Sequence, residues 1–106
     1  MPKYLLKVSY TADGVKGVLK DGGTKRRQAA EDAVKSTGGS LESMYFAFGE
    51  DDVYVIVDSP DNASVAAASM TIAASGLVKP TTVVLLTAEE IDQAAKKSAS
   101  YTPPGR

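Results

Sequence analysis

Apolar and polar residues alternate from Lys3 to Tyr10, a pattern typical of a β-strand with one buried face. The more apolar face consists of Tyr4, Leu6, Val8 and Tyr10, and the other of Lys3, Leu5, Lys7 and Ser9. Further along, two apolar runs at 41–48 and 53–57 flank the polar residues Gly49, Glu50, Asp51 and Asp52. This arrangement predicts a β-hairpin with a short loop, at the centre of the chain.

A helical period precedes the hairpin. Val15, Val18 and Leu19 predict a helical turn over 11–20, which Asp21-Gly22-Gly23 interrupts. Thr24 is the expected N-cap of a second helical piece to about residue 37, and Gly38-Gly39 ends it. The two pieces together form one broken crossover between strands.

A second helix and strand follow the hairpin. Ser59 followed by Pro60 supplies a cap residue and a proline, which suits the start of a helix over about 63–75. Gly76 ends it, and 77–87 reads as the last strand, with Pro80 favouring a sheet edge. Thr87-Ala88-Glu89-Glu90 has the form of a capping box for a short helix to about residue 97. We expect one domain over 1–97 and a disordered tail over 98–106.

The order of elements is βαββαβ, in which two right-handed crossovers place both helices on the same side of one sheet. The sequence therefore predicts a ferredoxin-like α+β fold, with a four-stranded antiparallel sheet and helices on one face.

The opposite sheet face then has no covering layer, and takes Leu5 and Lys7 from the first strand. The third strand contributes either Tyr54 and Ile56 or Val53, Val55 and Val57. The second strand contributes either Ser43, Tyr45 and Ala47 or Met44, Phe46 and Phe48. Either set is too apolar for a soluble monomer to expose. We therefore expect a homodimer or higher even oligomer, packed sheet to sheet.

Composition restricts the chemistry. The 106 residues include no cysteine and no histidine, which excludes disulfides, thiol chemistry and every Ser-His or Cys-His nucleophile. The net charge of −1 provides no field for nucleic acid or an anionic membrane. No stretch has the length of a membrane span or the form of a signal peptide. We expect a cytoplasmic protein with no cofactor, no metal, no nucleic-acid partner and no membrane partner.

Several stretches resemble the GYD family of small bacterial and archaeal proteins, over nearly the whole chain up to about Glu90. They are TADGVK, GGSLESMYF, DVYVIVDSPD and TTVVLLTAEE. The family is named for a Gly, Tyr, Asp signature at the hairpin turn, where Gly49 and Asp52 match its ends and Asp51 occupies the tyrosine position. The resemblance implies a ferredoxin-like domain of the dimeric α/β-barrel group, and it implies no particular activity.

Four residues form the candidate ligand-binding set: Lys7, Tyr45, Tyr54 and Asp52. A lysine inside a barrel can hold a carboxylate, and tyrosines can line a pocket for a small aromatic ligand. The structural alternatives are a lysine that reaches solvent or pairs across a dimer, and tyrosines that only pack. Three adjacent carboxylates at Glu50, Asp51 and Asp52 more closely fit a solvated turn than a cation site.

Lys25, Arg26 and Arg27 follow two glycines at a helix start, where free N–H groups favour anions. The competing interpretation is a solvated basic turn facing Glu31 and Asp32. Taken together, the sequence favours a homo-oligomeric α/β barrel that binds a small molecule in the barrel or at the subunit interface. The alternative is a small cofactor-independent oxygenase or isomerase of the same fold.

Overall fold

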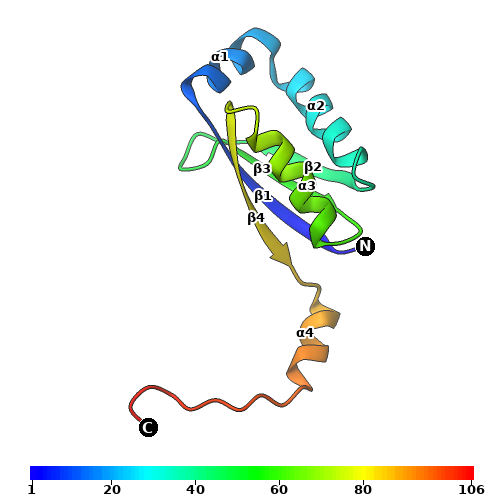
Figure 1. The fold of residues 1–106 in the computed structure, drawn as a ribbon, viewed down its shortest axis with the longest axis vertical. Helices are drawn as coiled ribbons and strands as arrows, with labels where there is room; N and C mark the ends of the chain where they lie inside the picture. The colour runs from blue at the N-terminus through cyan, green and yellow to red at the C-terminus, as the bar shows by residue number, and fades with distance from the viewer.

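The computed structural model describes residues 1–106 and contains four strands and four helices (Figure 1). In chain order these are β1 (Lys3–Tyr10), α1 (Ala12–Asp21), α2 (Gly23–Lys35), β2 (Ser40–Phe46), β3 (Val53–Asp58), α3 (Asn62–Ala73), β4 (Val78–Leu85) and α4 (Ala88–Ala95). The predicted order of strands and helices is confirmed.

The strands form one antiparallel sheet with the order β2-β3-β1-β4. Strand β1 lies between β3 and β4, so residues that are far apart in sequence become direct neighbours across it. Strand β4 is an edge strand, as Pro80 predicted, because proline cannot donate a ladder hydrogen bond. The register of β2 on β3 shifts between Leu41 and Ser43, which marks a β-bulge.

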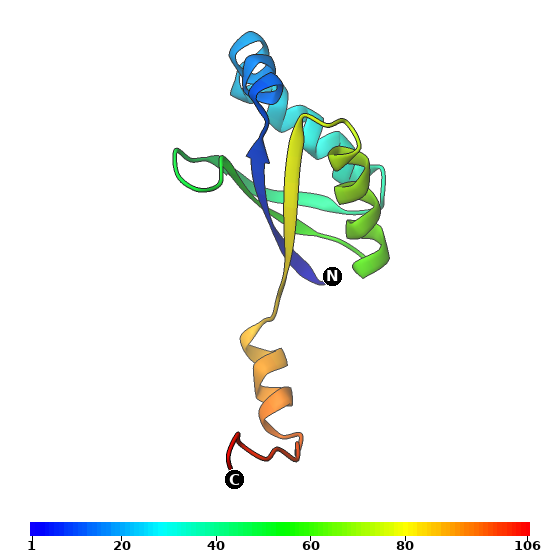
Figure 2. The same cartoon turned by 60° about the vertical axis from the view of Figure 1, so that its left-hand side comes forward.

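Helices α2 and α3 cover one face of this sheet, as the ferredoxin-like prediction requires (Figures 1 and 2). The core between the two layers contains Tyr4, Leu6, Val34, Val53, Val55, Val57 and Val65. Strand β3 therefore turns its valines toward the helices. Because side chains alternate along a strand, Tyr54 and Ile56 lie on the open face, with Ser43 and Tyr45 of β2 beside them.

The predicted N-caps of two helices are wrong. Helix α2 begins at Gly23, because Gly22 takes a left-handed φ of 79° and turns the chain directly out of α1, so Thr24 is not its N-cap. Helix α3 is capped by Asp61, whose carboxylate accepts from the Ser64 N–H at 2.8 Å. Ser59 is buried, and its N–H still bonds to the carbonyl oxygen of Pro2 at 3.1 Å, so it belongs to the end of the sheet.

Helix α4 projects away from the sheet and its helices, and no residue in it is buried (Figures 1 and 2). The predicted capping box is present: the Thr87 hydroxyl accepts from the Glu90 N–H at 3.1 Å, and Glu90 accepts from the Thr87 N–H at 3.1 Å. The projecting segment contributes to the long dimension of the molecule, which measures 55 × 34 × 22 Å. None of the helices is both long and apolar enough to span a membrane.

Candidate functional site

The open face of the sheet is organised in rows that run across the strands. The middle row is apolar, with Ile56 and Val83 on either side of Leu5, and Ser43 at the β2 end. The adjacent row places the polar groups of the candidate site in order: Tyr45, Tyr54, Lys7 and Thr81. The sheet register thus brings together three of the four predicted ligand-binding residues, Lys7, Tyr45 and Tyr54.

The Lys7 side chain pairs with the hairpin loop. Its Nζ lies 3.6 Å from a carboxylate oxygen of Asp51, and the Ser9 hydroxyl donates to the other Asp51 oxygen at 3.3 Å. The Asp51 side chain is only 15% exposed, against 39% for Lys7. The loop therefore places a partly buried carboxylate of the same chain against the cation.

The two tyrosines differ in exposure. Tyr45 is 72% exposed and Tyr54 is 37% exposed, although they lie directly opposite one another on β2 and β3. Tyr54 also lies opposite Lys7 on β1. An aromatic surface with one cation beside it suits a flat ligand that carries a carboxylate or another polar acceptor.

Asp52, the fourth predicted residue, is not part of this group. Its carboxylate accepts from the backbone N–H of Tyr10 at 2.8 Å, and its own N–H donates to the Val8 carbonyl at 2.8 Å. Its carbonyl accepts from the Ala47 N–H, also at 2.8 Å. Asp52 thus fastens the hairpin to the end of β1, and it is Asp51 that reaches the cation.

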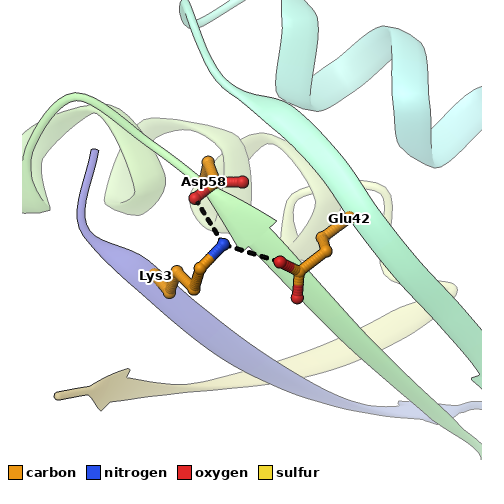
Figure 3. A network of polar contacts seen from close by, with 3 residues as sticks. All are labelled: Lys3, Glu42 and Asp58. Atoms are coloured by element: carbon orange, nitrogen blue, oxygen red, sulfur yellow. Dashed lines mark hydrogen bonds and ion pairs between the residues drawn. The ribbon is translucent and has the colours of Figure 1, made fainter. Parts of the chain in front are cut away.

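A second charged group lies at the other end of the open face. Lys3 Nζ lies 2.6 Å from Glu42 and 2.9 Å from Asp58, so that one lysine joins three strands (Figure 3). Hydrogen bonds to Glu42 and then to Asp58 raise the pKa of Lys3 above its ordinary value. The sequence pattern does not indicate this group, although the alternation along β1 places Lys3 and Lys7 on one face.

One known family model matches the part of the chain that forms the strands and helices. The model of the GYD domain matches residues 4–95. The chain belongs to the GYD family. Among curated proteins, no match was found.

The GYD match extends from β1 to the last residue of α4. The projecting helix is therefore part of the GYD domain, like the sheet. Within this GYD domain the hairpin contributes its second acidic residue, Asp51, to the open face and its third acidic residue, Asp52, to the support of β1.

Proposed function

We propose that this GYD protein is a homodimer, formed by packing two open sheet faces together, that binds a small molecule between the sheets. The observation that supports the proposal is the open face itself. Its middle row presents Leu5, Ile56 and Val83 without any covering layer in the chain. Tyr45 and Tyr54 extend the apolar surface toward the hairpin.

Such a surface is costly to leave in water. Soluble monomers rarely expose apolar patches larger than a few hundred Å². Burying even about 500 Å² of apolar surface contributes on the order of 12 kcal/mol, before the cost of association is subtracted. A second copy of the chain offers a matching apolar face of the same kind, and two-fold packing is the commonest form of homo-oligomer.

Charges on the open face favour a second copy over a charged partner. Lys3 is paired with Glu42 and Asp58, and Lys7 is paired with Asp51, within each chain. Both lysines of the face are thus paired within the chain, and these two lysines and three carboxylates leave a net charge of only −1, so two such faces can approach with modest net repulsion.

The projecting C-terminal segment supports assembly independently. Isolated helices of fewer than about 12 residues are marginal in water, and α4 has 8. Leu86 is 57% exposed and Ile91 is 51% exposed, so the chain itself covers only about half of these apolar residues. Packing on a second copy supplies the missing contacts.

The small-molecule part of the proposal concerns Lys7, Tyr45 and Tyr54. When a second sheet covers this row, the ion pair of Lys7 with Asp51 is enclosed among aromatic side chains. In such a site, a ligand carboxylate can compete with Asp51 for the lysine while its body stacks on the tyrosines. This arrangement supports binding, and it requires no catalytic step.

Assembly is tested with two neighbouring residues of the edge strand. Val83 is on the open face opposite Leu5, whereas Val84 lies opposite Tyr4 on the helix side. We expect Val83→Glu to give a monomer in sedimentation equilibrium and Val84→Glu to leave the dimer intact. Equal behaviour of the two variants would contradict packing through the open face.

Ligand binding is tested by native mass spectrometry of the gently purified protein. A reproducible extra mass on the dimer that is lost in Lys7→Ala and Tyr54→Phe, with the dimer retained, supports the site. If both substitutions only disturb the dimer, Lys7 and Tyr54 have a structural role.

A further inference from the structure

A separate cavity lies on the other side of the sheet, between the sheet and helices α2 and α3. It has a volume of about 90 Å³ and is lined by 13 residues, of which 12 are hydrophobic. Leu6 and Val55 form part of its floor, and Val34 and Ile72 part of its helical wall. The only charged lining residue is Arg26.

Arg26 differs from the two cations beside it in sequence. Lys25 lies 3.9 Å from Asp21, and Arg27 lies 3.3 Å from Glu31, but no carboxylate lies within the 4.0 Å ion-pair distance of Arg26. The guanidinium that lines this apolar cavity therefore forms no ion pair within the chain. Its planar fork matches the two oxygens of a carboxylate.

Tyr10 lies beside this guanidinium at the same end of the cavity. Burial raises the pKa of the Tyr10 phenol, while the positive charge of Arg26 acts in the opposite direction. Near neutral pH the hydroxyl is therefore protonated and available as a hydrogen-bond donor. Arg26 and Tyr10 together present donors to one anionic group.

A neighbouring hollow of about 280 Å³ shares Tyr10, Arg26 and Ile72 with the cavity and extends to Asp21 on α1. The charge of Asp52 also acts on Tyr10. The carboxylate of Asp21 in the hollow and the charge of Asp52 on Tyr10 disfavour a doubly charged ligand such as a phosphate monoester. A singly charged acid is the better match.

We propose that this cavity binds a small carboxylic acid with an apolar body, its carboxylate held by Arg26 and Tyr10. A benzene-sized guest occupies an apolar cavity of about 150 Å³. The 90 Å³ cavity therefore accepts a short aliphatic chain, and the hollow accommodates the carboxylate end. The site lies on the opposite face of the sheet from Lys7, so it does not depend on the proposed dimer.

Hexanoate is the probe for this site, and hexanamide is its neutral counterpart. In a methyl NMR titration of the full-length protein, we expect hexanoate to shift the signals of Val34 and Ile72 in the cavity and to leave Val83 on the open face unchanged. Hexanamide should bind at least about tenfold more weakly than hexanoate, because it cannot form the charged contact.

Matched variants test the role of the guanidinium. Arg26→Gln should weaken hexanoate binding about tenfold or more, whereas Arg27→Gln, which changes the neighbouring cation paired with Glu31, should bind as the wild type does. Ala30→Leu keeps Arg26 and fills the cavity, so it should also abolish binding. Circular dichroism and sedimentation confirm that each variant keeps its fold and oligomeric state.

Three results would overturn the proposal: no binding of hexanoate at millimolar concentration, equal affinity of the wild type and Arg26→Gln, or shifts confined to the open face. Because the oligomeric state is recorded for every variant, failure of this site is distinguishable from failure of the dimer.

Discussion

Asp52 is predicted to stabilise the fold, and its removal should lower the free energy of unfolding measurably. The substitution Asp52→Ala leaves both backbone hydrogen bonds of this residue in place and removes only the carboxylate that accepts from the Tyr10 N–H at 2.8 Å. Leaving a buried donor unpaired costs about 1–3 kcal/mol, and a charged acceptor strengthens the bond. Since the bond is only partly buried, we expect a loss of about 1.5 kcal/mol.

This loss corresponds to a clear change in the thermal midpoint. Unfolding entropies of about 2.1 cal/mol/K per residue give about 0.2 kcal/mol/K for 106 residues. The midpoint should therefore fall by about 7 °C. Urea unfolding followed by circular dichroism measures the free energy, at one protein concentration for all variants because assembly adds to apparent stability.

Two controls accompany this measurement. Asp52→Asn retains an acceptor oxygen and should lose less stability than Asp52→Ala. Glu50→Ala changes an exposed carboxylate of the same loop and should shift the free energy of unfolding by less than about 0.5 kcal/mol. If Asp52→Ala and Glu50→Ala change the free energy of unfolding by the same small amount, the Asp52 carboxylate does not stabilise β1. The prediction that Asp52 binds a ligand would then be the better explanation of this residue.

Three further predictions concern other parts of the chain. A chain ending at Leu85, without α4, should dimerise about tenfold more weakly in sedimentation equilibrium, because burial of one large apolar side chain contributes at least that factor to the affinity. An unchanged dissociation constant would show that α4 does not pack on the second copy. The Ser64 N–H holds the pKa of Asp61 below its ordinary value, so the carboxylate stabilises the fold above about pH 4, and this stabilisation is lost as the pH falls through the lowered pKa. The urea midpoints of the wild type should therefore converge on those of Asp61→Asn between about pH 5 and pH 2. A constant difference between the two proteins would contradict this. Arg26→Gln should raise the Tyr10 pKa further, as followed by NMR of the tyrosine ring. An unchanged pKa would show that the charge of Arg26 does not act on the Tyr10 phenol.

Strand alternation and turn residues predicted most of the fold. Tyr4 and Leu6 on one face of β1, the polar loop before Val53, and Pro80 at an edge are local patterns, and each has the predicted place in the sheet. The α4 capping box was readable for the same reason, since both of its hydrogen bonds join residues three positions apart.

The choice between the two faces of β3 could not be made from the sequence, because both the valines and the pair Tyr54 and Ile56 are apolar enough to be buried. The antiparallel register settles it by placing Val55 opposite Leu6. The ion-pair partner of Lys7 also could not be predicted from the sequence. The loop conformation decides which aspartate, Asp51 or Asp52, lies against the Lys7 side chain.

Arg26 was within reach of sequence reasoning. It precedes Ala29, Ala30 and Val34 by three, four and eight residues, which is the spacing of one helix face. Lys25 and Arg27 have similar spacings to these residues, and it is the structure that separates the three cations: Lys25 and Arg27 pair with Asp21 and Glu31, whereas Arg26 lines the cavity. What the spacing does not reveal is the cavity that Arg26 faces, because its shape depends on how α2 and α3 pack on the sheet.

The most direct test of the central proposal is the mass of the wild-type assembly at micromolar concentration, measured by native mass spectrometry and checked by sedimentation. The proposal predicts twice the mass of one chain, or a higher even multiple. A monomer at that concentration would contradict it, because Leu5, Ile56 and Val83 would then remain exposed to water without a partner.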